Sequence, residues 1–200
     1  MTANQAYKLQ LRAVGEDVTI WPVAKIVAPE VVSIGNSVII DDFVFIVGGR
    51  RTEIGSFVHI ASFTSMTGGG EVVMEDFTTL SSGVRVFSGT DDFLGGCLAN
   101  STIPYPYRIP ARSFVRIHKH AIIGANSVIL PGVTIGEGAA IGAHSLVCKD
   151  CEPWTVYAGS PAKLLKKRPK EKMLELEAQL RREVYDAEGR YVPMAKRMRA

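Results

Sequence analysis

The chain has 200 residues, of which 46% are hydrophobic and 22% are charged, and this composition excludes a disordered, collagen-like or membrane-embedded protein. The formal net charge of +3 hides an asymmetry, because residues 161–200 hold 12 lysines and arginines against 6 aspartates and glutamates. Aromatic residues make up only 8% of the chain and no nucleic-acid-binding motif is apparent, so the basic segment favours a small phosphorylated ligand over nucleic acid.

Neither a membrane span nor a secretory signal is apparent in the sequence. Long uncharged stretches such as residues 121–136 carry Gly, Asn, Ser and Pro, which do not suit a spanning helix. The first ten residues lack the basic and then apolar pattern of a secretory signal. The three cysteines, Cys97, Cys148 and Cys151, form an odd and sparse set that suits reduced thiols. We therefore expect a cytoplasmic protein without membrane insertion.

Aliphatic residues or Met recur at a fixed step along most of the chain. In the first part the steps are six, six and eight residues, so that each set of three repeats every twenty residues. After a break the step is six throughout. The positions are Val14, Ile20, Ile26, Ile34, Ile40, Ile46, Ile54, Ile60, Met66, Met74, Leu80 and Val86, and then Ile117, Ile123, Ile129, Ile135, Ile141 and Val147.

A six-residue period fits neither an α-helix nor one long strand, and it predicts short strands separated by turns. Three hexapeptides close one triangular coil, and stacked coils pair their backbones while the repeated aliphatic residues form ladders inside. We therefore expect an all-β solenoid of about six coils. Extra residues in the early coils, such as Arg51-Thr52, are expected to bulge one corner.

Two segments depart from the repeat. Residues 88–113 lose the register and contain three prolines and two tyrosines, and long irregular segments inside compact domains are usually functional. We expect them to form a projecting loop. Residues 170–187 carry apolar residues at helical spacing, which predicts one amphipathic helix that caps the solenoid or packs on another subunit. These apolar residues are Met173, Leu176, Leu180 and Val184.

Over residues 14–168 the sequence resembles the hexapeptide-repeat acyltransferases, most specifically in IGANSVILPGVTIGEGAAIGAHSLVCKDCEPWTVYAGSPAKLLKKR at residues 123–168. The resemblance implies a left-handed parallel β-helix domain in residues 1–168 and a C-terminal helix and tail in residues 169–200. It also implies a homotrimer, in which the loop reaches an active site shared with a neighbouring subunit. SGTDDF and the tyrosine-proline stretch after it resemble the sugar and lipopolysaccharide O-acetyltransferase branch.

The activity implied by this resemblance is transfer of an acetyl group from acetyl-coenzyme A to a sugar or nucleotide-sugar, in surface polysaccharide biosynthesis. The acceptor group is a hydroxyl or an amine, and the sequence leaves this choice open. Two other readings are also open: a zinc enzyme similar to the γ-class carbonic anhydrases, and a non-catalytic β-helix scaffold.

The family's usual catalytic histidine is absent from this chain, which reads Ser-Gly-Thr-Asp-Asp at residues 88–92. A base is needed because acyl transfer to a hydroxyl requires removal of its proton. One candidate is His59, expected to point outward from a coil beside the one that leads to the loop. The others are Asp91 and Asp92, as a base or as anchors for the acceptor. An amine acceptor could also react through positioning alone.

For the donor, the resemblance implies that coenzyme A lies along a groove between subunits. Small residues there allow close approach to the backbone, and basic residues meet the phosphates. The small residues are Gly124, Ala125, Gly142 and Ala143, and the basic residues are Lys163, Lys166, Lys167 and Arg168.

We expect no metal site, because the histidine spacing does not match that of the zinc enzymes and the Cys148-x-x-Cys151 motif lacks a second pair. His118 and His120 are expected at the surface of a subunit corner, and His144 at an interface. Cys151 is expected to be a buried thiol.

Overall fold

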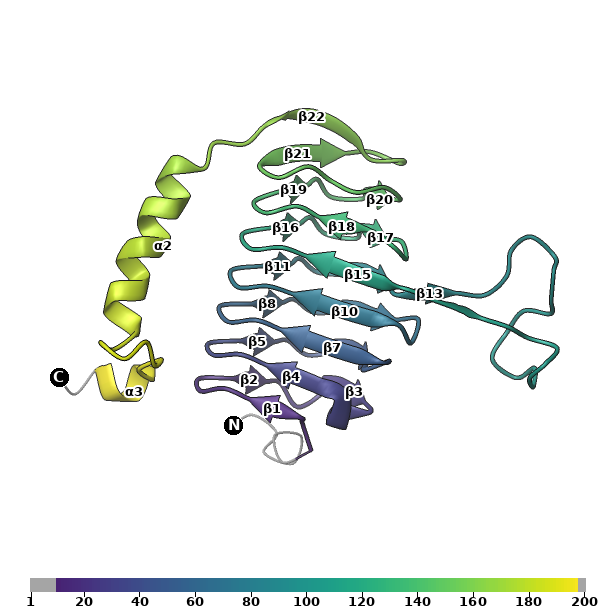
Figure 1. The fold of residues 1–200 in the computed structure, drawn as a ribbon, viewed down its shortest axis with the longest axis horizontal. Helices are drawn as coiled ribbons and strands as arrows, with labels where there is room; N and C mark the ends of the chain where they lie inside the picture. The colour runs from purple at the N-terminus through teal and green to yellow at the C-terminus, as the bar shows by residue number, and fades with distance from the viewer. Residues whose placement is uncertain (1–9, 198–200) are drawn as a thin grey trace.

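The computed structural model describes residues 10–197, which form a parallel β-solenoid of about seven turns followed by a helix (Figure 1). The fold class expected from the sequence is confirmed, with about one turn more than predicted. Residues 1–9 and 198–200, which the predicted domain boundaries include, lie outside the described part of the chain. Among the described residues, no helix combines the length and the apolar character needed to cross a membrane.

Three sheets form the sides of the solenoid, and we call them sheets A, B and C in the order in which the chain visits them. Sheet A contains β1 (Ala13–Val14), β4 (Val32–Ile34), β7 (Arg51–Ile54), β10 (Glu71–Met74), β15 (Phe114–Ile117) and β18 (Thr134–Ile135). Sheet B contains β2 (Thr19–Ile20), β5 (Ile39–Ile40), β8 (His59–Ile60), β11 (Thr79–Leu80), β16 (Ile122–Ile123), β19 (Ala140–Ile141), β21 (Thr155–Ala158) and β22 (Lys163–Lys167). Sheet C contains β3 (Lys25–Val27), β6 (Phe45–Val47), β9 (Ser65–Thr67), β12 (Arg85–Phe87), β17 (Val128–Ile129) and β20 (Leu146–Val147).

The strand register follows the sequence repeat. In the early coils Ile40 pairs with Ile60 at a separation of twenty residues, and after the break Ile123 pairs with Ile141. The repeated aliphatic residues point inward, and most of them are less than 5% exposed. Burial of each such side chain contributes about 1.5–3 kcal/mol, so the interior ladders are the main source of stability.

The extra residues of the early coils do not bulge a corner as predicted. Arg51 and Thr52 instead lengthen β7 to four residues, whereas the corresponding later strand β18 has two. Thr52 is fully buried, and its hydroxyl donates a hydrogen bond to the carbonyl of Gly48 at 2.9 Å. The added length is therefore absorbed inside sheet A.

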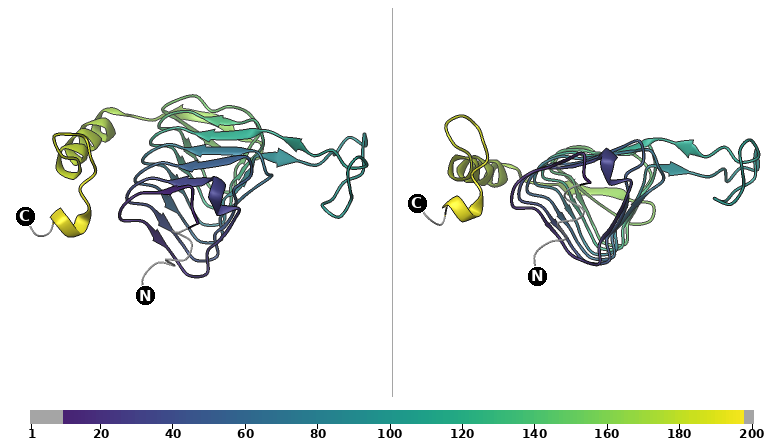
Figure 2. Two further views of the ribbon diagram at one scale, coloured as in Figure 1. Left: turned by 60° about the horizontal axis from the view of Figure 1, so that its bottom comes forward. Right: turned by 90° about the horizontal axis from the view of Figure 1, so that it is seen from below.

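The three corners of the triangular cross-section differ in what is attached to them (Figure 2). We call the turns from sheet A to sheet B the helix corner, those from sheet B to sheet C the third corner, and those from sheet C to sheet A the arm corner. A short 3-10 helix, Pro29–Val31, lies at the arm corner of the first coil.

Residues 88–113, which we call the arm, leave the arm corner between β12 and β15 and project away from the solenoid (Figure 1). At its base β13 (Gly89–Thr90) pairs antiparallel with β14 (Ala111–Arg112). The predicted projecting loop is therefore present.

The C-terminal helix α2 (Glu171–Val184) does not cap the end of the solenoid, and its packing on another subunit stays a prediction. Instead, β22 lies antiparallel on β21 at the last coil, and α2 runs back along the helix corner (Figures 1 and 2). Its contacts with that corner include an ion pair between Glu177 and Lys119. The short helix α3 (Met194–Arg197) follows.

Candidate active site

Two pockets flank the base of the arm and share part of their lining. One has a volume of about 430 Å³ and is lined by polar groups that include Ser101, Arg108 and Arg112. The other has a volume of about 330 Å³ and is lined partly by Phe93, Leu130 and Pro131. Both contain Phe87, Gly89, Thr90 and Asp91. The arm base therefore offers a polar and an apolar compartment side by side.

Asp91 is held by a single partner across the arm. Its Oδ1 accepts a hydrogen bond from Arg108 Nε at 2.7 Å, and Arg108 Nη2 lies 2.6 Å from the same oxygen in an ion pair. The side chains are 26% and 17% exposed, so this ion pair is largely shielded from solvent. No hydrogen bond to Oδ2 is found among residues 10–197.

Asp92 is engaged by the backbone of its own turn. Its Oδ1 accepts a hydrogen bond from the Leu94 N–H at 2.7 Å, and its Oδ2 accepts one from the Cys97 N–H at 2.8 Å. These backbone hydrogen bonds, that from Leu94 first, lower the pKa of Asp92 below its ordinary value. Its carboxylate therefore stabilises the conformation of the arm.

His59 lies on β8 in sheet B, with its side chain 46% exposed, as expected of an outward-pointing residue. Its Nε2 is 3.1 Å from Asp41 Oδ2, a partner that sequence reasoning missed. The coil of His59 stacks on the coil that leads into the arm, as expected, because β8 pairs with β11. Sheet B, however, lies across the triangle from the arm corner (Figure 2). One chain therefore does not bring His59 together with Asp91.

The small residues expected near the donor stack on one another at the third corner. The Gly124 N–H donates to the Ile141 carbonyl, and the His144 N–H donates to the Ala125 carbonyl, both at 2.8 Å. A Cβ atom on Gly124 would lie 2.5 Å from the backbone nitrogen of Ala143, and one on Gly142 would lie 2.9 Å from the Cβ of Ala158. Close packing of successive coils is thus sufficient to require glycine at both positions.

The four basic residues expected at the phosphates have different environments. Lys163 and Lys166 are exposed on β22 and have no ion pair among the described residues. Lys167 Nζ contacts Glu152 at 2.9 Å. Arg168 donates through Nη1 to the carbonyls of His120 and Gly138, and burial lowers its pKa. Arg168 therefore joins coils of the solenoid.

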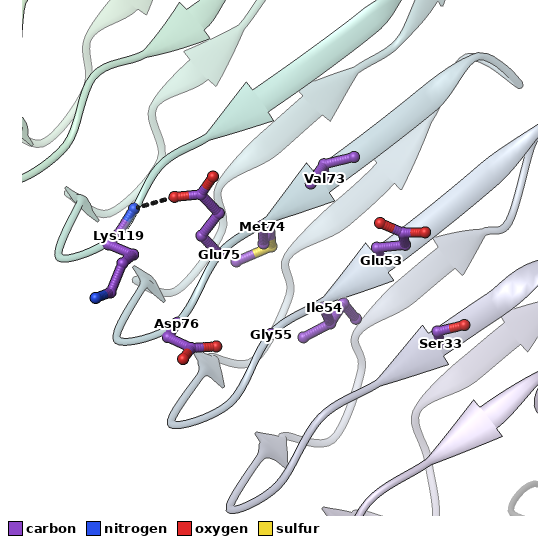
Figure 3. Close-up of a pocket in the computed structure, with 9 residues that line it drawn as sticks. All are labelled: Ser33, Glu53, Ile54, Gly55, Val73, Met74, Glu75, Asp76 and Lys119. Carbon is purple, nitrogen blue, oxygen red and sulfur yellow. Dashed lines mark hydrogen bonds between the residues drawn. The ribbon is translucent and has the colours of Figure 1, made fainter. Parts of the chain in front are cut away.

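A groove of about 540 Å³ lies along sheet A beside the helix corner, and sequence reasoning did not predict it (Figure 3). Acidic side chains line it. Glu75 accepts hydrogen bonds from His118 Nδ1 at 2.9 Å and from the Lys119 N–H at 3.0 Å. Asp76 accepts one from Arg181 Nη2 at 2.9 Å. These carboxylates are committed to contacts within the chain, so the groove is better explained as part of the structure.

His120 is buried and not at the surface as predicted. It is 5% exposed, and its Nε2 donates to Glu177 Oε2 at 2.6 Å. Its ring is 5.1 Å from that of Phe77 and 5.9 Å from that of Trp154.

Among residues 10–197, no three His, Cys, Asp or Glu side chains lie close enough together to hold a metal ion. Cys151 is buried as predicted, and burial raises the pKa of its thiol to about 12.

Comparison with known proteins gives consistent results. Residues 114–149 match the family model described as bacterial transferase hexapeptide (six repeats). The chain is 41% identical over 175 residues, or 87% of this chain and 91% of the relative, to the dTDP-4-amino-4,6-dideoxy-D-glucose acyltransferase of Escherichia coli. It is also similar to AntD, an N-acyltransferase from Bacillus cereus, in complex with dTDP and 3-hydroxybutyryl-CoA, with 40% identity, a TM-score of 0.83, and coverage of 90% and 97% of the two chains. A variant of AntD in complex with dTDP-4-amino-4,6-dideoxyglucose and coenzyme A is 41% identical, with a TM-score of 0.82 and coverage of 88% and 93%.

Proposed function

The chain belongs to the hexapeptide-repeat acyltransferase family, and we propose that it transfers an acyl group from an acyl-coenzyme A to the amino group of a dTDP-linked amino-deoxy sugar. The observation that carries this proposal is the similarity to AntD and to the Escherichia coli acyltransferase, which extends over nearly the whole of each chain. Both relatives favour an amine over a hydroxyl as the acceptor.

The reaction requires little covalent chemistry from the protein. The amino nitrogen attacks the thioester carbonyl, a C–N bond forms and the C–S bond breaks. The sulfur leaves as a thiolate and takes up the proton that the nitrogen loses. Since an ammonium group is not nucleophilic, the protein must bind the acceptor and allow loss of one further proton before attack. Positioning and proton removal are therefore the tasks of its residues.

The arrangement of the candidate residues supports a homotrimer with shared sites. His59 lies on sheet B, and the small residues of the third corner directly follow the sheet B strands β16 and β19. The exposed lysines lie on β22 of the same sheet. The arm leaves the opposite corner. In this proposal one subunit provides the donor half of a site, and the arm of a partner subunit brings the acceptor.

We assign roles on this basis. His59, hydrogen-bonded to Asp41, is the proposed base, and the arm carboxylates Asp91 and Asp92 are the acceptor side. The donor lies along the third corner, and the exposed Lys163 and Lys166 are the residues best placed to meet its phosphates. The donor residues proposed together are Gly124, Ala125, Gly142, Ala143, Lys163, Lys166, Lys167 and Arg168.

The acyl group and the setting complete the proposal. Acetyl is the group expected from the sequence, and the AntD complex with 3-hydroxybutyryl-CoA makes a longer chain the second donor to test. Acyl-coenzyme A and nucleotide-linked sugars are metabolites of the cytoplasm, where we place the reaction, and the acylated sugar is then available for surface polysaccharide biosynthesis.

A direct assay tests the activity. The purified protein is incubated with dTDP-4-amino-4,6-dideoxyglucose and either acetyl-CoA or 3-hydroxybutyryl-CoA, and free thiol is measured while mass spectrometry identifies the product. The matched control acceptor is dTDP-glucose, which carries a hydroxyl in place of the amine. We expect an amide from the amino sugar and none from the control. Absence of thiol release with the amino sugar would contradict the proposal.

Subunit mixing tests the shared site. His59→Ala and Asp91→Asn are each expected to be poorly active, and mixed trimers contain sites with native His59 from one chain and native Asp91 from another. Mixing after subunit exchange is therefore expected to restore part of the activity. A fully active monomer by light scattering would refute the trimer.

A further inference from the structure

The helix corner has the same backbone geometry in successive coils. One residue of each turn that leads into sheet B has a φ between 52° and 64°, in the left-handed region. After the first of these residues, the backbone N–H of each donates to a carbonyl of the coil before it, at 2.7–3.2 Å. The residues therefore form a continuous column, which we call the corner column. Its members are Asp17, Ser37, Phe57, Phe77, His120, Gly138 and Trp154.

The chain after the solenoid follows the corner column in the opposite direction (Figure 1). We call this segment, residues 168–197, the strap. At its start, Arg168 Nη1 donates to the carbonyl of His120 at 3.1 Å. Further along, the guanidinium of Arg181 lies 5.2 Å from the centre of the Phe77 ring. Later residues of the strap thus contact earlier coils of the solenoid.

The far end of the strap reaches the first coil. The Tyr191 hydroxyl and the Met194 N–H both donate to Asp17 Oδ2, at 2.8 and 2.7 Å. The ring of Tyr191 also meets that of Phe57 edge-on, with the ring centres 6.0 Å apart. We call the contacts of Asp17 with Tyr191 and Met194 the latch. The latch joins residues 174 and 177 positions apart in the sequence.

Separate polar and aromatic contacts hold the strap, and it lacks a continuous apolar seam. Among residues 168–197, Val184 alone is buried. A pocket of about 240 Å³ lies between α2 and the corner column, lined partly by Met173, Leu176 and Leu180. The aliphatic ladders inside the solenoid make no use of these side chains. The strap can therefore leave the corner while the interior of the solenoid stays packed.

We propose that the strap opens and closes over the helix corner as one unit, with the latch at Asp17 as its closing contact. Docking of α2 through Glu177 keeps the end of the strap near Asp17, which raises the effective concentration of the latch groups. By linkage, a closed latch stabilises the docking of α2 to the same extent. This inference goes beyond acyl transfer, because it concerns a conformational change that joins the last coil to the first.

Hydrogen exchange measured by mass spectrometry on the full-length protein tests this coupling. Asp17→Asn removes the charge of the latch, and asparagine also tolerates the left-handed φ of 54° at this position. We expect exchange to rise about 10- to 100-fold in residues 190–197, the range for a lost hydrogen bond to a charged group. We also expect a rise in α2, which does not contact Asp17, because a helix of 14 residues is only marginally stable once undocked.

Two further variants test the coupling from the other positions. Glu177→Gln weakens the docking of α2 and should also raise exchange in residues 190–197, which do not contact Glu177. Tyr191→Phe removes one latch hydrogen bond and keeps the ring against Phe57, so its effect should be smaller than that of Asp17→Asn.

Asp42→Asn is the matched control. Asp42 also joins the first two coils, because its Oδ1 accepts the Val23 N–H at 2.8 Å, but it does so at the third corner, away from the strap. We expect this variant to leave exchange in the strap at the wild-type rate. An increase in the strap equal to that of Asp17→Asn would indicate general loosening of the early coils and overturn the role of the latch.

The remaining outcomes decide whether the strap moves as one unit. If Asp17→Asn raises exchange in residues 190–197 and leaves α2 at the wild-type rate, the latch is a local contact and the proposal is wrong. If Glu177→Gln leaves residues 190–197 unchanged, the coupling is likewise refuted. Each measurement is made without substrate, so its result is independent of whether the protein acylates an amino sugar.

Discussion

At the helix corner Glu177 accepts contacts from three side chains, whereas at the arm corner Asp91 accepts contacts from one. Lys119 Nζ and Arg181 Nε reach Glu177 Oε1 at 2.8 and 2.6 Å, and His120 Nε2 reaches Oε2. Glu177 is 10% exposed, and both of its oxygens are used. The comparison indicates that a fully satisfied carboxylate holds this fold together, while a carboxylate with a free oxygen is available to a ligand.

The aromatic rings also differ between the two corners, because those at the helix corner pack against one another and that of Phe93 on the arm is exposed. At the helix corner Phe57 stacks on Phe77 at 4.8 Å, and the ladder continues through His120 to Trp154. These residues have φ between 52° and 60°, a left-handed conformation that costs about 1–2 kcal/mol per residue. Aromatic stacking returns about 0.5–1.5 kcal/mol per pair, so the ladder offsets much of this cost. On the arm Phe93 is 90% exposed, and its ring stacks on no other ring within residues 10–197.

The largest effect expected from this comparison is at His59, whose Nε2 contacts Asp41 while its other ring nitrogen has no partner among residues 10–197. We expect His59→Ala to lower kcat by about 10²- to 10⁴-fold, the usual contribution of a positioned base. Steady-state kinetics and calorimetry with coenzyme A check this, with donor affinity and Tm near the wild-type values. If kcat is retained, a free polar atom outside the arm does not indicate a catalytic role, and the acceptor amine reacts by positioning alone.

The next effect concerns stability at the helix corner. Glu177→Ala leaves His120 buried without its partner and removes two further charged contacts. We expect a loss of about 2–3 kcal/mol in the free energy of unfolding, below the range for a fully buried ion pair because Lys119 and Arg181 retain solvent contact. Denaturant unfolding measures the loss. Turnover per folded molecule should be unchanged, and a selective fall in kcat would break the distinction between the two corners.

Acid should weaken the helix corner within a defined pH range. Burial by itself raises the pKa of Glu177, but hydrogen bonds from Lys119, Arg181 and His120 outweigh it and lower the pKa to about 2, from an ordinary value of 4.5. The lowered pKa means that the stabilisation is fully present above pH 4.5 and is lost as the pH falls toward 2. Tm measured over this range should fall less steeply in Glu177→Gln than in the wild type. Parallel curves would show that Glu177 does not carry the effect.

The solenoid could be predicted from the sequence because its signal is local and repeated. Each coil contacts only its neighbours, so the spacing of residues such as Ile40 and Ile60 determines both the interior ladder and the strand register. The presence of the arm followed from the loss of that spacing. Counting three strands per coil would also have predicted the position of His59 relative to the arm. His59 lies on the second strand of its coil, whereas the arm follows the third strand of the next coil, so the two lie on different sides of the triangle.

The contacts that distinguish the two corners had no such signal. Glu177 meets His120 at a separation of 57 residues, and Asp91 meets Arg108 across an irregular segment. Neither pair recurs from coil to coil, so no periodicity reports it. The position of α2 depends on the first pair. The difference between Asp91 and Asp92 depends on the second pair. Neither pair could be identified without the structure.

The smallest effect is expected at the basic residues of β22, where the same distinction between free and engaged groups applies. Lys163 and Lys166 are exposed and unpaired among the described residues, whereas Lys167 contacts Glu152. Lys163→Gln/Lys166→Gln should weaken coenzyme A binding by about 2- to 10-fold, because exposed charge pairs contribute little each. Binding of dephospho-coenzyme A, which lacks one phosphate, should change less.

Lys167→Gln is compared with the single variants Lys163→Gln and Lys166→Gln, because the charge of Lys167 is already engaged by Glu152 and its removal should weaken binding less than either of them. Added salt should reduce the difference between wild type and double variant, since exposed charges are screened over about 10 Å at 0.1 M ionic strength. Calorimetry at two salt concentrations measures this. Equal losses for coenzyme A and dephospho-coenzyme A would show that these lysines do not contact the distinguishing phosphate, and an unpaired charge on β22 would then be no guide to the donor site.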